Sequence, residues 1–263
     1  MSTASDRREA LKDLLMAARG CTRCAELAST RTSVVFGAGN ADADLMFVGE
    51  APGANEDLQG LPFVGAAGKL LETLLGEIGL SRAEVFIANV LKCRPPGNRD
   101  PRPREIENCT PYLVRQIELV APRVICTLGN FATKLLREDP AGITRVHGTA
   151  EVRTIGSHTA RLFPIYHPAA ALYTPRTLDL LREDFRALPG VLGLPAPDAP
   201  AYGERAQACG EPAPASGARA PASDEQGPAS GERAPAPGER DAAPGTPAPP
   251  GAAPPGTTQL GLF

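Results

Sequence analysis

Four cysteines are the residues whose type and spacing most directly suggest chemistry. Cys21 and Cys24 form a Cys-Thr-Arg-Cys motif, whereas Cys93 and Cys109 lie far downstream and bracket an arginine- and proline-rich stretch. Zinc sites usually present two close pairs of ligands, and two-cluster ferredoxins show denser runs of cysteine, so both fit this spacing less well. A single cubane iron–sulfur cluster needs four converging thiolates and fits better. The spacing therefore favours an iron–sulfur centre that closes a long loop.

A second group of candidate residues is polar or aromatic and lies in short turns. Glu50 stands in the Gly-Glu-Ala-Pro-Gly turn at 49–53, where glycine lets backbone N–H groups approach a ligand, although an ordinary strand-to-helix turn has the same composition. Phe63, between proline and valine, is either a stacking platform for a flat ligand or a core residue. Asn89 follows an apolar run, and its amide suits either the edge of a nucleobase or the capping of its own strand. His167 precedes a proline, which restrains it to extended backbone.

Strand and helix patterns alternate along the first part of the chain and position these candidates. Four apolar runs predict buried strands, at residues 44–48, 85–90, 123–128 and 161–166. Helical spacing of apolar residues predicts helices between and after them, at 66–78, 104–120, 130–137 and 178–188. This alternation predicts an α/β fold of three layers, α/β/α, around a central four-stranded parallel sheet. The turn residues follow the strands, so we expect them to meet at the carboxyl edge of the sheet, where ligands bind in such folds.

Composition divides the chain into a body and a tail. Of the 28 prolines, 15 lie in residues 191–263, where Ala, Pro, Gly and Ser dominate. Such a segment buries too little apolar surface to offset the entropy of ordering, so we predict one folded domain at 1–190 and a disordered linker at 191–258. The body carries 22 acidic and 23 basic residues, so a basic footprint for nucleic acid must be local, and residues 92–104 are the candidate.

The sequence also indicates the cellular compartment in which the protein works. No apolar run approaches the about 20 residues of a membrane span. Residues 1–8 lack the apolar segment of a signal peptide. Six cysteines in such a chain argue against a disulfide framework. We therefore expect a cytoplasmic protein with no membrane partner, and we expect it to be a monomer.

Several motifs together resemble the family 4 uracil-DNA glycosylases. The matching segments are Gly-Glu-Ala-Pro-Gly at 49–53, Pro-Phe-Val-Gly at 62–65, Asn-Val-Leu-Lys-Cys-Arg-Pro-Pro at 89–96 and His-Pro-Ala-Ala at 167–170. They occur in the family's order, and the resemblance covers roughly residues 14–188. It implies a four-stranded parallel sheet between helices and removal of uracil from DNA during base excision repair. It also implies that a structural [4Fe-4S] cluster is bound by four residues, Cys21, Cys24, Cys93 and Cys109.

The resemblance further implies roles for the residues that follow the strands. Phe63 would lie against the face of uracil, Asn89 would bind its Watson–Crick edge, and His167 would contact O2, where negative charge grows as the glycosidic bond breaks. Glu50 is the candidate that positions the attacking water or stabilises the sugar cation, with Glu56 as a second candidate. The substrate-binding set implied in this way is Gly49, Glu50, Ala51, Phe63, Asn89 and His167. Family 1 enzymes carry an aspartate where this chain has Ala51, so the water-activating group stays open.

Two further partners and two rival classes follow from the sequence. DNA containing uracil is the expected substrate, and Gln259-Leu260-Gly261-Leu262-Phe263 resembles the short motif by which bacterial proteins bind the sliding clamp. One rival is a relative that becomes covalently attached to DNA through a histidine in the loop near the cysteines, but residues 94–108 contain no histidine. The other rival is a non-catalytic iron–sulfur protein that binds DNA or the clamp.

Overall fold

The strands form one sheet with two kinds of edge. The computed structural model describes residues 3–197, and its strands follow the order β1-β3-β2-β4-β6-β5. They are β1 (Ala38–Gly39), β2 (Leu45–Gly49), β3 (Phe86–Asn89), β4 (Val124–Leu128), β5 (Glu151–Ile155) and β6 (His158–Ile165). The four inner strands pair in parallel, whereas β1 and β5 pair antiparallel with β3 and β6. The part of the chain described here is therefore an α/β fold with a mixed, mostly parallel sheet.

The number of strands corrects the sequence prediction. The four predicted strands correspond to β2, β3, β4 and β6, but the sheet is six-stranded rather than four-stranded. β1 is only two residues long, and β5 is an edge strand in which most residues are partly or fully exposed. Neither therefore presents the continuous apolar run of a buried strand. β5 returns to β6 through a tight turn at Gly156, whose φ of 59° suits glycine.

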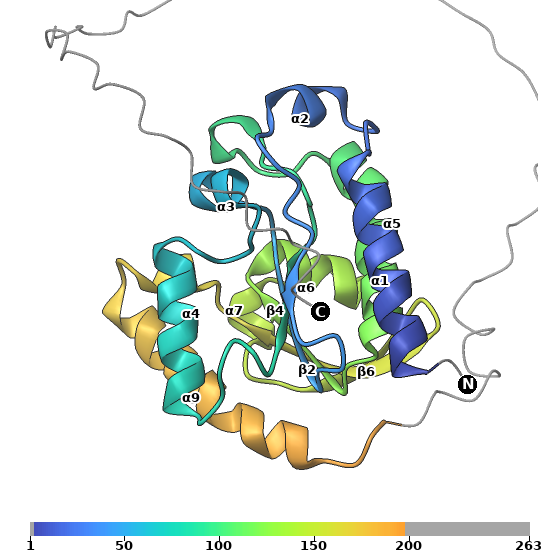
Figure 1. The fold of residues 1–263 in the computed structure, drawn as a ribbon. Helices are drawn as coiled ribbons and strands as arrows, with labels where there is room; N and C mark the ends of the chain where they lie inside the picture. Colours follow the sequence, from blue (N-terminus) through green and yellow to red (C-terminus); the bar gives the residue numbers. More distant parts are fainter. Residues whose placement is uncertain (1–2, 198–263) are drawn as a thin grey trace, which may run out of the picture. The chain divides into compact units, whose positions relative to one another are not determined.

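Helices cover both faces of the sheet (Figure 1). They are α1 (Ala4–Arg19), α2 (Ala25–Thr30), α3 (Ala54–Gln59), α4 (Ala66–Glu77), α5 (Pro103–Val120), α6 (Asn130–Arg137), α7 (Ile143–Val146), α8 (Pro168–Ala171) and α9 (Pro175–Gly193), with a 3-10 turn, η1 (Pro96–Asn98). The predicted helices correspond to α4, α5, α6 and α9, and α9 extends past the predicted domain end at residue 190. None of the helices within residues 3–197 has the length and apolar character that crossing a membrane requires.

The two faces bury two separate cores because side chains alternate along each strand. In β2, Met46 and Val48 pack with α1, α5 and α6, whereas Leu45 and Phe47 pack with α4 and α9. Phe47 stacks on Phe185 of α9, with ring centroids 5.9 Å apart. The predicted three layers are therefore present. The predicted linker from residue 198 onward and the clamp motif Gln259–Phe263 lie outside the described residues.

Candidate active site

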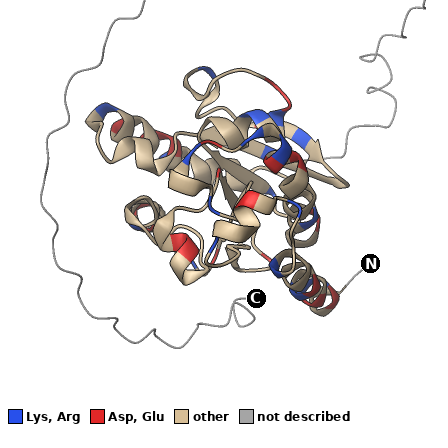
Figure 2. Ribbon diagram, turned by 90° about the horizontal axis from the view of Figure 1, so that it is seen from above, with Lys and Arg blue, Asp and Glu red and all other residues tan. Residues whose placement is uncertain are grey.

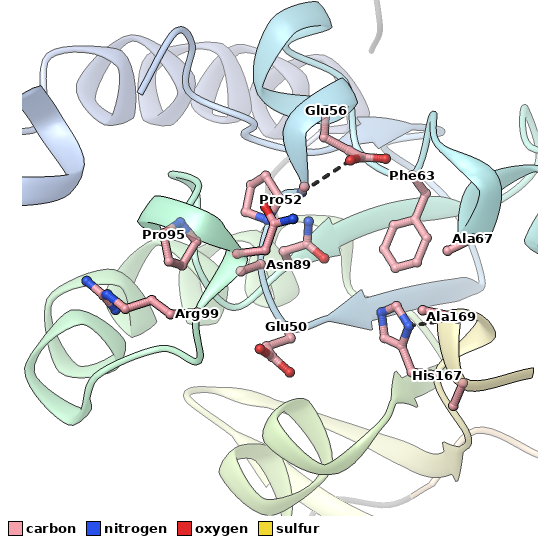
Figure 3. Close-up of a pocket in the computed structure, with 14 residues that line it drawn as sticks. Glu50, Pro52, Glu56, Phe63, Ala67, Asn89, Pro95, Arg99, His167 and Ala169 are labelled. Carbon is pink, nitrogen blue, oxygen red and sulfur yellow. Dashed lines mark hydrogen bonds between the residues drawn. The ribbon is translucent and has the colours of Figure 1, made fainter. Parts of the chain in front are cut away.

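A pocket lies at the carboxyl edge of the parallel strands (Figure 3). Its volume is about 470 Å³, within the range of small-molecule sites. Five of the predicted site residues line it: Glu50, Ala51, Phe63, Asn89 and His167. They come from the ends of β2, β3 and β6 and from the loop before α4. The predicted convergence of these turns on one rim is thus observed.

Gly49 lies beneath the pocket, where there is no room for a side chain. A Cβ at this position would lie 2.4 Å from Asn89 Oδ1 and 2.7 Å from Phe63 Cζ. Phe63 has a φ of 53°, in the left-handed region that a bulky residue rarely adopts. The Arg82 guanidinium holds this turn by donating to the carbonyls of Pro62 and Phe63. Gly49 therefore lets the Phe63 ring and the Asn89 amide approach each other. Phe63 belongs to the buried core and also forms a wall of the pocket.

Asn89 ends β3 with an acceptor that has no partner within the described chain. The residue is 2% exposed, and its Oδ1 is buried without a hydrogen bond. An unsatisfied buried acceptor costs about 1–3 kcal/mol, so such groups are rare outside functional sites. Its backbone carbonyl, by contrast, accepts from Lys92 Nζ at 2.7 Å. Asn89 thus keeps an amide acceptor available to a ligand that brings an N–H donor.

His167 stands opposite with its tautomer fixed by the backbone. Its Nδ1 accepts from the Ala169 N–H at 3.1 Å, so the neutral ring carries its proton on Nε2. Burial lowers the pKa of His167 to about 4, while Glu56 acts weakly in the opposite direction. The ring stacks on Phe63 with centroids 5.6 Å apart (Figure 3). At neutral pH, His167 is therefore an uncharged hydrogen-bond donor at the pocket.

The two candidate carboxylates have different surroundings. Glu56 is fully engaged: it accepts from the N–H groups of Gly53 at 3.1 Å and of Val64 and Gly65 at 2.8 Å. Glu50 has no hydrogen-bond partner for its carboxylate within residues 3–197. Burial, together with the negative charge of Asp100, raises the pKa of Glu50 to about 7. Glu56 shapes the loop, whereas Glu50 stays available at the pocket.

The four predicted ligand cysteines lie in what we call the cysteine lobe, residues 20–33 and 92–109. All four are half-buried free thiols that pack against the same apolar core. Burial raises the pKa of Cys93, and the nearby charges of Cys21 and Cys24 act in the same direction. Burial, opposed by Lys92 and assisted by Cys93 and Cys24, raises the pKa of Cys109 to about 11. The four thiols therefore pack against one core, and their charges act on one another.

The four thiols do not form a site for a single metal ion. Nowhere in residues 3–197 do three Cys, His, Asp or Glu side chains gather closely enough to hold one metal ion. A cubane places each cysteine on a different iron atom, so its ligands stand further apart. Three donors point at the sulfurs: Arg31 Nη1 to Cys93 at 3.1 Å, the Lys92 N–H to Cys109 at 3.2 Å and Asn108 Nδ2 to Cys24 at 3.5 Å. Donors of this kind stabilise thiolates, which is the form that binds iron.

Known proteins resemble this chain over the residues that form the pocket. A protein-family model described as "Uracil DNA glycosylase superfamily" matches residues 36–188. A type-4 uracil-DNA glycosylase of Archaeoglobus fulgidus is 46% identical over 194 residues, which are 72% of this chain and 96% of the relative. Those of Sulfurisphaera tokodaii and Thermotoga maritima are 50% and 44% identical, over 64% and 58% of this chain and 78% of each relative.

The chain belongs to the type-4 uracil-DNA glycosylases. The family resemblance inferred from the motifs is thereby confirmed.

In this type-4 glycosylase the cysteine lobe also supplies one wall of the pocket. Pro95, Asn98 and Arg99 line the cavity (Figure 3). None was predicted as a site residue, although Pro95 lies in the 89–96 motif and all three lie in the basic stretch 92–104. Arg99 forms a two-pronged ion pair with Glu105 of α5 at 2.6 and 3.0 Å, and reaches Glu26 of α2 at 3.0 Å. Glu26 lies far from Arg99 in the sequence, so only the excess of arginine at 92–104 indicated that this stretch could be functional.

The pocket turn is tied to the cysteine lobe from a second side. Asp57 of α3 is buried, and its carboxylate accepts from the N–H groups of Thr32 at 3.0 Å and Ser33 at 3.2 Å.

Figure 2 shows lysine and arginine residues interspersed with acidic residues over the ribbon, as the near-neutral body implies. Arg102 and Arg104, at the start of α5, are exposed on the cysteine lobe. The lobe therefore has local basic character despite the balanced total.

Proposed function

We propose that this chain hydrolyses the N-glycosidic bond of uracil in DNA, releasing uracil and leaving an abasic site, the first step of base excision repair. The observation that carries the proposal is the unpaired Asn89 Oδ1 facing a pocket that also holds a neutral His167 donor. Membership of the type-4 family supports the same activity.

Uracil recognition rests on the amide of Asn89 and the ring of Phe63. Oδ1 would accept from uracil N3–H and Nδ2 would donate to O4, and the flipped base would stack on Phe63. Cytosine presents the reversed donor and acceptor pattern at this edge, so it would leave both amide groups facing like partners. Asn89 Oδ1 is already buried and unpaired, so the cost of removing it from water arises before the base binds. Binding therefore favours uracil, whose N3–H donates to it.

Bond cleavage rests on stabilising the departing uracil anion. As the bond between C1′ and N1 lengthens, negative charge grows on O2, and the Nε2–H of His167 would donate to it. Because the pKa of His167 is about 4, the ring does not transfer its proton at neutral pH but acts as a fixed dipole. The sugar becomes cationic, and Glu50, with its carboxylate unpaired, would stabilise that cation and position the attacking water. Glu56 keeps the loop in shape through its three backbone hydrogen bonds.

We also propose that Cys21, Cys24, Cys93 and Cys109 hold a [4Fe-4S] cluster. Four half-buried thiols that pack against one core, with donors aimed at three of them, support this assignment. When bound, the cluster would supply a cross-link between segments far apart in sequence rather than a reagent for the sugar. The cross-link would hold the cysteine lobe in place, and this lobe contributes Asn98 and Arg99 to the pocket wall.

One experiment separates the enzyme from its rivals. The purified protein is incubated with an oligonucleotide that contains one uracil, and the DNA is then heated in alkali. Strand scission at the uracil position together with free uracil is the expected result. A protein–DNA adduct that survives denaturation would instead indicate the covalent relative. Intact DNA from an iron-loaded sample would contradict the proposal and favour a non-catalytic binding protein.

We further propose that Gln259–Phe263 binds the bacterial sliding clamp. Leucine and phenylalanine after a glutamine suit an apolar pocket that accepts a peptide, and tethering would raise the local enzyme concentration at replicating DNA. Deleting residues 259–263 should abolish clamp binding in a pull-down and leave excision from a free oligonucleotide unchanged. Replacing only Gly261 by alanine, which keeps the apolar anchors, is the control. Clamp binding that survives the deletion would refute the proposal.

A further inference from the structure

Lys92 is a lysine enclosed between the pocket and the cysteine lobe. Only 2% of its surface is exposed. Its Nζ donates to the Asn89 carbonyl at 2.7 Å and to Gln116 Oε1 at 2.5 Å, and lies 5.9 Å from the centroid of the Phe36 ring. Both acceptors are neutral. A buried ammonium without a charged partner is costly, so its place here requires a nearby source of negative charge.

Two cysteines lie beside this residue. Cys93 follows it in the sequence, and no carboxylate among the described residues pairs with its Nζ. The Lys92 backbone N–H also donates to Cys109 Sγ at 3.2 Å. Cysteines that bind iron do so as thiolates, so a loaded site places negative charge beside the ammonium. The same residue thus contacts the ligand region through its backbone N–H and the uracil-binding residue through its Nζ.

We propose that Lys92 is a positioning residue that couples the charge of the cysteine ligands to the placement of Asn89. The proposal rests on the proposed function, since Asn89 is the residue whose amide reads uracil. The Nζ of Lys92 holds the carbonyl of Asn89, while its backbone N–H holds Cys109 Sγ. Gln116 completes the arrangement, because its Nε2 donates to the Phe36 carbonyl at 2.9 Å and thereby fixes the acceptor that faces Lys92. Displacing Lys92 would shift an amide whose position decides whether it meets the base.

The alternative is that Lys92 merely satisfies buried hydrogen bonds. Two variants in the same buried network separate these roles. Lys92→Met keeps the length of the side chain but removes the charge and the donor. Gln116→Met removes an acceptor of the same hydrogen bond and keeps the charge. Lys92→Gln removes the charge and keeps an amide donor, and serves if Lys92→Met does not fold.

Three quantities are measured on iron-loaded protein: the midpoint potential of the cluster, single-turnover excision of uracil, and binding to DNA that already contains an abasic site. We expect the potential of both Lys92 variants to move to more negative values, because a positive charge that stabilises the added electron is gone. The potential of Gln116→Met should stay at the wild-type value. Excision by Lys92→Met should fall by up to about 100-fold, the effect of displacing a reacting group by about an ångström. Binding to abasic DNA, which has no base to read, should not change.

The inference and the proposed function fail in different ways. If the wild-type protein binds iron and excises uracil but the potentials of the Lys92 variants equal that of Gln116→Met, the coupling is wrong and Lys92 is only a structural hydrogen-bond donor. Wild-type excision rates in Lys92→Met would also overturn it. If the iron-loaded wild-type protein does not excise uracil, the proposed function itself fails. A shifted potential would then still establish the contact between Lys92 and the cluster.

Discussion

The pocket and the cysteine lobe differ in how their polar side chains are paired. At the pocket, Asn89 Oδ1 has no hydrogen bond, and Glu50 has no partner for its carboxylate within residues 3–197. In the lobe, the terminal nitrogens of Arg99 are held by two carboxylates, although its buried Nε has no partner, and Arg31 donates to Cys93. Unpaired polar groups cost stability and persist where a ligand satisfies them, whereas paired groups hold a shape. The difference assigns the chemistry to the pocket and the support of its wall to the lobe.

The largest effect should come from removing the unpaired amide. Asn89→Ala should lower single-turnover excision of uracil by about 100-fold or more, because the contacts that distinguish the base are lost. It should leave folding intact, since the lost Oδ1 made no internal hydrogen bond. Asn40→Ala is the matched control. Asn40 lies in the loop before β2, at the end of that strand opposite to the pocket. If the two variants excise uracil equally well, Asn89 does not read the base.

A large effect of another kind should come from the lobe. Cys93→Ala should purify with little iron and a lower midpoint of thermal unfolding, because the cross-link between distant segments is lost. Cys126→Ala is the control: Cys126 is fully buried in β4 and away from the lobe, so the variant should keep its iron and lose about 1 kcal/mol of stability or somewhat more. Absorbance near 400 nm per mole of protein measures the first outcome. Full iron content in Cys93→Ala would exclude it as a ligand.

The strands predicted from the sequence were those that are buried on both faces. The inner strands β2, β3 and β4 read as continuous apolar runs because helices cover both of their sides. The edge strands lack such a run: β5 is defined by its pairing with β6 across a turn, and β1 is a two-residue strand that pairs with the distant β3. Local pattern thus gave the parallel core and not the borders of the sheet.

The same limit applies to the site. Asn89 and His167 could be placed together because the carboxyl ends of parallel strands share one edge. Arg99 could not be placed, because its position depends on ion pairs with Glu26 and Glu105, and the first of these lies far away in sequence. That Glu50 is unpaired while Glu56 is engaged also depends on loop geometry that no motif states.

A smaller effect distinguishes Glu50 by its pH dependence. With a pKa of about 7, Glu50 is protonated below and ionised above that pH, so wild-type excision should rise as pH increases through about 7. Glu50→Gln should be slower by roughly tenfold at pH 8 and should lack this limb, a change within the range for one positioned acid or base. His167, with a pKa of about 4, does not titrate in this window. A wild-type pH profile in Glu50→Gln would assign the limb to another group.

Stability gives an independent check on the same carboxyl. Because its folded pKa is raised above the ordinary value of 4.5, the folded state binds more protons than the unfolded state between about pH 4.5 and 7. Wild-type stability should therefore fall as pH rises through this window, and Glu50→Gln should remove that contribution. Thermal unfolding of both proteins at pH 5 and pH 8 measures it: the variant should gain relative to wild type only at the higher pH.

The division between pocket and lobe is tested most directly by one rate measured at matched iron content. Single-turnover excision is compared among wild type, His167→Ala and His158→Ala, since His158 begins the strand that His167 follows and its ring contacts the Pro122 carbonyl instead. We predict equal iron per mole in all three, excision slower by about 100-fold or more in His167→Ala, and a near wild-type rate in His158→Ala. An iron-loaded His167→Ala that excises uracil at the wild-type rate would contradict the account.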